Sequence, residues 1–345
     1  MIPFVQVVFL LFLGSSERQW NHVHAFQSSS CHIRGTRVSS SSPSILGTTT
    51  SLRVATNPET SIDPTGKRTT PKEVVSMFDD FAESFEEKLV DVLDYKAPQN
   101  VSMRALERIK EDRNGKLYKS AIDAGCGTGL IGPLLRPHVK GPMVGVDLSP
   151  KMAELAAELV VDDAYTANAD KVKNRMRRCG EVARTAQNID RLYDGVFTGD
   201  LLQLHDASKI KFIDGLGHSV TSFPTKPVEL IVCTDVLCYF GDMSEILAKF
   251  SDRLQIGGDL IFTTETLAQG DYNWVMTVSE RYAHDADYVR RMAANAGLAK
   301  VSQTPFTPRW ESGEKVLGIL HTFTKTDDVI ASTMSPNDLM DKPPL

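Results

Sequence analysis

The stretch AIDAGCGTGL, residues 121–130, places three glycines on alternate positions directly behind an apolar run. Gly125, Gly127 and Gly129 would each destabilise the interior of a helix or strand by about 0.5–1 kcal/mol relative to alanine. The glycines therefore predict a loop, and the run before them predicts a buried strand that ends at Asp123. Without side chains, the backbone of such a loop allows a bulky ligand to approach closely, and the helix that follows favours negative charge at its N-terminus.

Strands and helices alternate along the rest of the chain. Apolar runs predict parallel strands at 119–123, 142–147, 194–200, 228–236 and 259–265, with helices at 131–135, 149–159, 243–254 and 285–297. The last two runs, 299–306 and 315–325, can pair as an antiparallel hairpin at the edge of the sheet. Repeated strand–helix units require right-handed crossovers with helices on both faces. We therefore predict an α/β fold with a doubly wound, mainly parallel seven-stranded sheet, of the Rossmann-like kind.

Acidic residues follow two of these strands at the places where an adenosine would be recognised. In an open parallel sheet, ligands bind outside the carboxyl ends of the strands, where the strand order reverses. Asp147 ends the second strand, where a carboxylate can accept from both ribose hydroxyls. Asp200 ends the third strand, where it can accept from an adenine amino group, with Leu201 packing near the ring. These positions predict an adenosine-containing ligand beside the glycine loop.

The ordered set DAGCGTG, GVDLSPKM, GDLLQL, CTDVLCYF and IGGDLIFTTE resembles the class I S-adenosylmethionine-dependent methyltransferases. The resemblance covers roughly residues 74–325. It implies S-adenosylmethionine as cofactor and the three glycines along its methionine part, with Asp123 and Leu148 also at the cofactor. It further implies that Asp235, after the fourth strand, contacts the methionine end or the incoming acceptor.

Three further segments look like one subgroup of that family. FDDFAESFEEKLVDVLDYKAP, VLCYFGD and SERYAHDADYVRRMAANAG are similar to methyltransferases that are often fused to tetratricopeptide repeats and are related to the methyltransferase of the Williams–Beuren deletion region. No such repeats precede the domain in this chain. The resemblance implies a cofactor and a reaction class, and it leaves the acceptor open, with a small molecule favoured over a protein.

The candidate catalytic residues are Tyr239, Tyr282 and His284, with Glu265 a further possible base. A sulfonium methyl group is already activated, so orientation of the acceptor is the main requirement. A base would add about 10²–10⁴-fold for a neutral hydroxyl or amine. Each of these residues can instead make a structural hydrogen bond or lie on the surface. Arg281 can hold an acidic group of the substrate.

An amphipathic helix precedes the first strand. Its apolar face carries Phe78, Phe81 and Phe85 at helical spacing, which is typical of core packing and is also compatible with a lid over the ligand. The segments 161–190 and 205–224 interrupt the strand–helix rhythm. We expect the first to be helical and the second to be a loop, either as substrate-recognition insertions or as solvated excursions.

Charge and cysteine spacing exclude several classes of protein. A net charge of −6 over 345 residues argues against binding of nucleic acid through bulk charge. The cysteines lack the spacing of a zinc site and predict free thiols rather than a disulfide framework; they are Cys31, Cys126, Cys179, Cys233 and Cys238. We therefore predict no metal site.

The N-terminal region is typical of a targeting sequence rather than of a folded domain. Residues 1–14, MIPFVQVVFLLFLG, form a short apolar run of signal-peptide length, and we expect a signal peptide at 1–25 that ends at Val23-His24-Ala25, directly before Phe26. Residues 26–70 are rich in serine and threonine, and no acidic residue lies between Glu17 and Glu59. This arrangement resembles the bipartite presequences of algae with secondary plastids; the alternative is a secretory signal with a disordered linker. We expect the methyltransferase domain at 71–325, a disordered tail at 326–345 and no membrane association after processing.

Two other functions are compatible with parts of this pattern. A nicotinamide-dependent oxidoreductase shares the fold and the ribose carboxylate, but its usual glycine spacing is G-x-G-x-x-G. Here the third glycine, Gly129, comes one residue earlier. A protein that binds the cofactor and regulates partners without catalysis remains the second alternative.

Overall fold

The apolar run in front of the glycine loop forms β1 (Ala121–Ala124), which is buried along its whole length. In the computed structural model, the described residues are 70–82, 94–160, 191–213, 217–267, 272–277, 279–311 and 313–327. Strand β1 belongs to a ten-stranded sheet with the order β4-β3-β2-β1-β5-β6-β12-β9, to which β8 and β7 add beside β6. The other strands are β2 (Met143–Asp147), β3 (Gly195–Thr198), β4 (Lys211–Phe212), β5 (Val228–Cys233), β6 (Leu254–Thr266), β7 (Trp274–Met276), β8 (Tyr282–His284), β9 (Leu298–Phe306) and β12 (Gly318–Lys325).

The central strands are parallel and the C-terminal pair is antiparallel. Strands β3, β2, β1, β5 and β6 pair in parallel, whereas β12 lies antiparallel between β6 and β9. The chain builds the sheet outward from β1 in one direction through β3, and then returns to β5 on the other side of β1. The strand order therefore reverses between β1 and β5. This arrangement confirms the predicted doubly wound, mainly parallel fold with an antiparallel hairpin.

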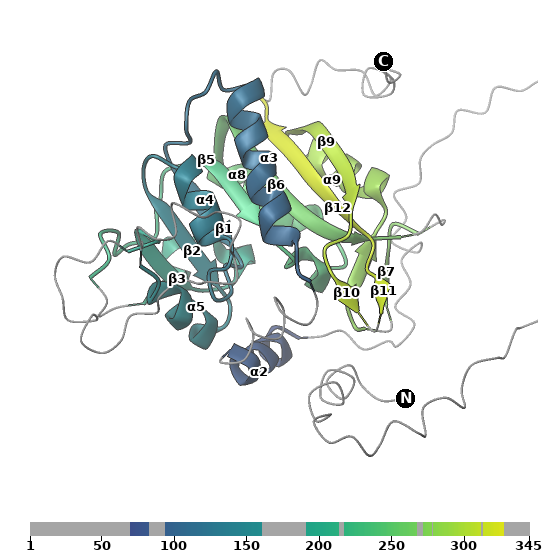
Figure 1. Ribbon diagram of the computed structural model, residues 1–345, viewed down its shortest axis with the longest axis horizontal. Helices are drawn as coiled ribbons and strands as arrows, with labels where there is room; N and C mark the ends of the chain where they lie inside the picture. Colours follow the sequence, from purple (N-terminus) through teal and green to yellow (C-terminus); the bar gives the residue numbers. More distant parts are fainter. Residues whose placement is uncertain are drawn as a thin grey trace, which may run out of the picture. The chain divides into compact units, whose positions relative to one another are not determined.

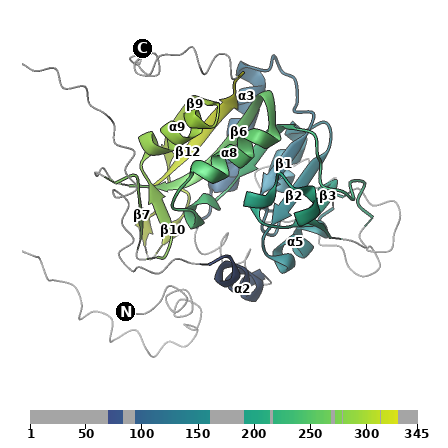
Figure 2. The same ribbon diagram turned by 180° about the vertical axis from the view of Figure 1, so that it is seen from behind.

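Helices cover both faces of the sheet, as the alternation of side chains along the strands requires. One face carries α3 (Ala97–Glu111), α4 (Gly132–Leu135) and α5 (Pro150–Ala157), which lie in front of the sheet in Figure 1. The other face carries α8 (Ser244–Arg253) and α9 (Ala286–Asn295), in front in Figure 2. Within β1, Ile122 and Ala124 pack in the core under α8 and α9, and Ala121 packs in the core under α3 and α5.

Helix caps explain where several helices begin. Ser149 caps α5 by accepting from the Met152 amide at 3.2 Å, and Asp285 caps α9 by accepting from the Tyr288 amide at 2.7 Å. Helix α2 (Pro71–Phe81) begins with a capping box between Thr70 and Glu73. The starts of α5 and α9 lie where the sequence predicts them.

The structure differs from the predicted elements in three places. The sheet has ten strands rather than the predicted seven. The additional strands are β4, β7 and β8, which were not predicted because such short strands have little apolar periodicity of their own. Strand β6 begins at Leu254, five residues before the predicted run, and includes Gly257 and Gly258. Segment 205–224 contains the 3₁₀ helix η7 (Ala207–Lys209) and strand β4 rather than a loop alone.

Several predictions fall outside the described residues. These are the presequence at 1–69, the segment 161–190, Phe85, the C-terminal tail from 328, and the cysteines Cys31 and Cys179. The three cysteines that the structure describes, Cys126, Cys233 and Cys238, are buried free thiols, which agrees with the prediction of free thiols.

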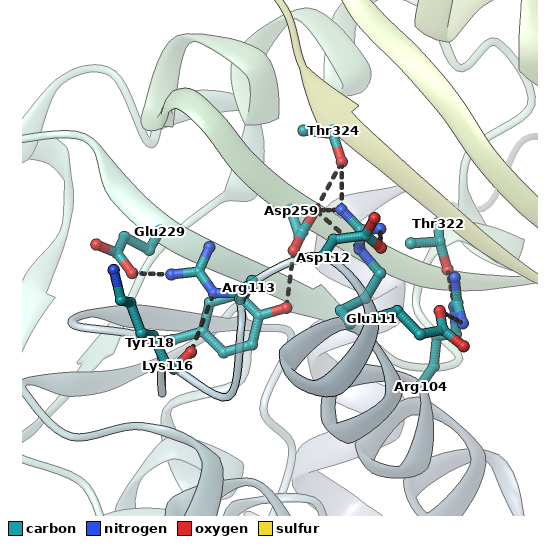
Figure 3. A network of polar contacts seen from close by, with 11 residues as sticks. Arg104, Glu111, Asp112, Arg113, Lys116, Tyr118, Glu229, Asp259, Thr322 and Thr324 are labelled. Atoms are coloured by element: carbon teal, nitrogen blue, oxygen red, sulfur yellow. Dashed lines mark hydrogen bonds and ion pairs between the residues drawn. The ribbon is translucent and has the colours of Figure 1, made fainter.

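Helix α3 was not predicted, and a buried polar network fixes it to the sheet (Figure 3). The carboxylate of Asp259 in β6 is completely buried. It accepts from Arg108 Nη2 of α3 at 3.0 Å, from the Tyr118 hydroxyl at 2.8 Å and from the Thr324 hydroxyl at 2.7 Å. Three elements far apart in the sequence thus meet at one side chain.

Candidate functional site

The carboxyl ends of four neighbouring strands bring the predicted site residues into one row. In spatial order, Asp200 follows β3, Asp147 ends β2, the glycine loop follows β1 and Asp235 follows β5. Register fixes the neighbours: Ala124 pairs with Val146, and Asp147 pairs with Thr198. The Gly199 amide also donates to the Asp147 carbonyl at 2.9 Å. The row lies at the reversal of strand order, where open α/β sheets bind ligands.

All three glycines of the loop adopt backbone conformations that side chains disfavour. Their φ angles are +75° at Gly125, +53° at Gly127 and +89° at Gly129. A Cβ at Gly125 would lie 2.3 Å from Cγ2 of Val236, well inside van der Waals contact. The loop therefore lies directly against the chain that follows β5. Only glycine satisfies both the backbone angle and the close approach at residue 125.

Asp147 holds the loop in place with both of its carboxylate oxygens. Oδ2 accepts from the Gly127 amide at 2.8 Å, and Oδ1 accepts from the Ser149 amide at 2.9 Å. Burial raises the pKa of Asp147 to about 6, although these two amides act to lower it. The side chain is half-buried, and a carboxylate has about four acceptor positions. Two positions are therefore left for ligand hydroxyls.

Asp123 lies deeper than the other candidates. It is 1% exposed, and its Oδ2 accepts from the Tyr193 hydroxyl at 2.6 Å. Burial raises the pKa of Asp123 to about 7, against the Tyr193 hydrogen bond and with a contribution from Asp147. Among the described residues, its Oδ1 and the buried Oγ1 of Thr128 have no hydrogen-bond partner. This region thus has more polar capacity than the described residues satisfy, which fits a polar ligand beside the loop.

The adenine end of the predicted site is formed by the chain after β3. Asp200 is half-buried and caps the 3₁₀ helix η6 (Leu201–Gln203) by accepting from the Leu202 amide at 2.9 Å. Leu201 is buried, and Leu148, after β2, is half-buried. A carboxylate beside apolar side chains has the chemistry that an adenine edge and face require.

A buried ring of alternating charges closes the other end of the row. We call Asp235, Arg281, Glu265 and Arg309 the ion ring. Arg281 reaches Asp235 at 2.6 Å and Glu265 at 2.7 Å. Arg309, which is 1% exposed, reaches Asp235 at 3.2 Å and Glu265 at 2.6 Å. Each guanidinium thus bridges both carboxylates. The third nitrogen of Arg309, Nε, binds Glu311 at 2.6 Å.

Backbone strain gathers at the ion ring. Asp235 has a φ of +58°, and Glu280, directly before Arg281, has a φ of +59°. Such conformations of residues other than glycine cost about 1–3 kcal/mol each and gather at functional sites. Burial alone would raise the pKa of Asp235, but Arg281 and Arg309 outweigh it and keep the pKa below its usual value. Asp235 is therefore a fixed anion beside the glycine loop.

The three candidate catalytic residues lie around the 3₁₀ helix η8 (Leu237–Tyr239), in different environments. The Arg281 guanidinium lies 5.4 Å above the Tyr239 ring. Burial raises the pKa of Tyr239, with Arg281 opposing, so its hydroxyl stays protonated and can donate a hydrogen bond. Tyr282 is buried, with its ring edge against Trp274 at 5.3 Å.

His284 has the environment of a structural residue. It is 0% exposed, and its Nε2 lies 2.8 Å from the Phe240 carbonyl and 3.1 Å from the Gly241 carbonyl. Since carbonyls only accept, Nε2 carries the proton. Burial lowers the pKa of His284 to about 4, so the ring is neutral at pH 7. This geometry favours anchoring of the chain after η8 over proton transfer to an acceptor.

The ion ring contains one residue that sequence reasoning missed. Arg309 lies 74 residues from Asp235, between a strand and a two-stranded hairpin, and no motif marks it. Glu265 and Arg281 were considered as a base and as a ligand for an acidic substrate. The structure pairs them with each other instead.

Helix α2 lies over the site in the position expected of a lid. The Phe78 ring meets the Tyr239 ring edge-on at 5.7 Å. The next residue, Asp79, accepts from the Ser149 hydroxyl at 2.5 Å, two residues after Asp147. One turn of α2 therefore touches the chain after β2 and the chain after β5. The Phe81 and Phe85 side chains lie outside the described part of the chain.

No group of three or more histidine, cysteine or acidic side chains in the described ranges could hold a metal ion. None of the described helices is long and apolar enough to cross a membrane.

Comparison with known proteins gives one family and a set of similar folds. No curated protein sequence matches the chain. Among solved structures, an N-methyltransferase NodS from Bradyrhizobium japonicum WM9 in complex with S-adenosyl-L-homocysteine is 16% identical, with a TM-score of 0.38 over 65% of this chain and 87% of that one. The magnesium protoporphyrin IX methyltransferase ChlM from Synechocystis PCC 6803, with bound S-adenosylmethionine, is 14% identical, with a TM-score of 0.38 over 66% and 79%. An S-adenosylmethionine-dependent methyltransferase from Clostridium acetobutylicum ATCC 824 is 14% identical, with a TM-score of 0.39 over 73% and 100%.

The family model described as "Methyltransferase domain" matches residues 91–303, which is more than half of the chain and includes the carboxyl ends of β1, β2, β3 and β5 that form the row described above. The chain belongs to the methyltransferase-domain family.

Proposed function

We propose that this protein transfers a methyl group from S-adenosylmethionine to a small-molecule acceptor. The observation that carries the proposal is the row of groups at the reversal of strand order. A glycine loop with three positive φ angles lies there between the carboxylates of Asp147 and Asp235. Membership of the methyltransferase-domain family supports the reaction class, and the ligands named for two proteins of similar fold agree with the cofactor.

Each end of the row takes a different part of the cofactor in this proposal. Asp147 accepts from the ribose hydroxyls, and Asp200 with Leu201 binds the adenine. The glycine loop lines the methionine part, and Asp235 lies at its end. The bound cofactor supplies an activated methyl group on a sulfonium. The protein's own contribution is to align the acceptor behind that carbon and to exclude water, with α2 as the cover.

The first test is binding of the demethylated cofactor. S-adenosylhomocysteine at a hundred times its Kd should stabilise the folded chain by about 2.7 kcal/mol, because it binds only the folded state. We expect a corresponding rise in melting temperature, measured by calorimetry, and no rise with NAD. An unchanged melting curve with S-adenosylhomocysteine, together with a shift in NAD, would instead indicate an oxidoreductase. Turnover of methyl-labelled cofactor on a small-molecule extract then distinguishes an enzyme from a regulator that only binds.

The affinity for S-adenosylhomocysteine should fall in acid. In the free protein the pKa of Asp147 is raised to about 6 by burial. Ribose hydroxyls donate to its ionised form, so binding lowers this pKa. The affinity is then full above pH 6 and falls by at most about tenfold per pH unit below it.

Titration calorimetry between pH 7 and pH 5 would measure this slope. Asp147→Asn should bind more weakly at pH 7 and lose the slope, since the amide does not titrate. A slope that persists in Asp147→Asn would assign the pH dependence to another group, of which Asp123 is the first candidate because burial raises its pKa to about 7.

The cellular setting is a separate part of the proposal. Delivery to a plastid rests on the signal-peptide-like run at 1–25 and the acid-free stretch that follows it. Placement in the subgroup related to the Williams–Beuren-region methyltransferase rests on the three quoted segments.

A further inference from the structure

The ion ring lies at the end of the site where the acceptor would enter. Residue Asp123 of β1 pairs with Val232 of β5, so the chains after the two strands run side by side. Val236 touches the backbone of Gly125, and Asp235 directly precedes Val236. If the glycine loop lines the methionine part of the cofactor, the ion ring therefore borders the transferred methyl group.

The two arginines of the ring are already paired with carboxylates. All three nitrogens of the Arg309 guanidinium bind carboxylates of Asp235, Glu265 and Glu311. Arg281 donates to Asp235 with Nη2, whereas its Nε lies 2.7 Å from Glu265 without the geometry of a hydrogen bond; the guanidinium lies 5.4 Å above the Tyr239 ring. An acidic acceptor would therefore compete with these carboxylates for the same guanidiniums.

The charge at this end is negative. Three carboxylates, those of Asp235, Glu265 and Glu311, face two guanidiniums. Strands β10 (Trp310–Glu311) and β11 (Glu314–Lys315) form a hairpin. Its lysine, Lys315, does not neutralise the excess negative charge. Its ammonium lies 5.4 Å above the Trp310 ring instead. Among the described residues one carboxylate therefore remains in excess, and a cation would balance it.

Aromatic rings lie beside the ion ring. Tyr239 lies under Arg281, Phe78 meets Tyr239 edge-on, and Tyr95 is 9% exposed. Burial and the charge of Asp235 raise the pKa of Tyr95, so its phenol stays neutral beside the ring. Aromatic faces and a nearby anion are the two features that favour ammonium groups.

We propose that the ion ring, with Glu311 and the neighbouring aromatic rings, forms a cation-binding subsite and that the methyl acceptor presents an amino group to it. The inference rests on the proposed methyl transfer and adds the class of acceptor. An acceptor ammonium first releases one proton to solvent. The nitrogen lone pair then forms a bond to the methyl carbon while the carbon–sulfur bond breaks and its electron pair stays on sulfur. The positive charge thus passes from sulfur to nitrogen and stays within reach of the same carboxylates.

Two cofactor analogues test the subsite without an identified acceptor. S-adenosylhomocysteine carries no charge at the sulfur, whereas sinefungin carries an ammonium group in place of the sulfonium methyl. The full chain should bind sinefungin about tenfold more tightly than S-adenosylhomocysteine. Glu311→Gln keeps the size of the side chain and removes the excess charge. We expect it to reduce that preference about fivefold while the affinity for S-adenosylhomocysteine changes little.

Glu314→Gln is the matched control, since Glu314 faces Glu311 in the same hairpin and is exposed. It should leave the preference at the wild-type value. Binding of both analogues with equal affinity, or equal effects of the two substitutions, would overturn the cation-binding subsite and leave methyl transfer standing. Failure of the chain to bind either analogue would overturn the proposed function itself, and the subsite with it.

The product of the labelled extract gives a second test. A labelled product that a cation exchanger retains at pH 7 supports an amine acceptor. A labelled product that only an anion exchanger retains overturns it.

Discussion

Replacing Asp259 with alanine is expected to lower the free energy of unfolding by about 3–5 kcal/mol. The substitution removes the shared partner of Arg108, Tyr118 and Thr324 (Figure 3). Arg108 is 7% exposed and Tyr118 is 0% exposed, so water cannot replace the lost bonds. The buried Tyr118 hydroxyl would lose its partner, and Arg108 would keep only the half-exposed Asp112 and the Thr324 hydroxyl, where α3 meets the sheet.

The control for this prediction uses the other carboxylate on the same arginine. Asp112 also pairs with Arg108, but its side chain is 50% exposed. Asp112→Ala should cost less than about 1 kcal/mol. Urea denaturation of both variants measures the difference. Equal losses would mean that solvent reaches Arg108 and that Asp259 does not hold α3.

Local sequence signals were enough for the central part of the fold. Apolar runs bounded by glycine or aspartate predict β1, β2, β3 and β5, because strands that are buried on both faces must be apolar throughout. Side-chain caps mark the starts of α5 and α9. The row of Asp147, Gly125 and Asp235 follows from these strands alone, since parallel strands place their carboxyl ends at one edge.

The rest depends on contacts between distant residues. Helix α3 begins at Ala97 without a side-chain cap from Lys96, and the proline in its first turn is the one local signal of its start. Arg108 and Asp259 lie 151 residues apart, and Arg309 and Asp235 lie 74 apart. Arginine is expected at the surface, so nothing in the sequence marks these two as buried. Tyr239 and His284 were chosen by residue type, and only the structure separates a stacked phenol from a buried neutral imidazole.

The substitution with the largest expected effect on cofactor binding is Gly125→Ala. Residue 125 has a φ of +75°, and the added Cβ would lie 2.3 Å from Cγ2 of Val236. Either the loop or Val236 must move, and both border the predicted methionine part of the cofactor. We expect the affinity for S-adenosylhomocysteine to fall about a hundredfold, or about 2.8 kcal/mol.

Gly257→Ala separates the steric clash from the backbone strain. Gly257 also has a φ of +75°, but no atom lies within 4 Å of its added Cβ. Both substitutions should therefore destabilise the fold by about 1–2 kcal/mol through the left-handed backbone. Only Gly125→Ala should weaken binding, measured by titration calorimetry on samples whose melting shows them to be folded.

A second substitution at the contact tests the cause directly. Val236→Ala removes the atom that the new Cβ meets, so the double variant Gly125→Ala/Val236→Ala should regain part of the lost affinity. Such a gain is a coupling between two residues in contact, which independent sites would not show. Equal losses of affinity in Gly125→Ala and Gly257→Ala would assign the effect to strain alone. Wild-type affinity in both would place the cofactor away from the loop, because a ligand that contacts this backbone cannot be indifferent to a displaced Val236.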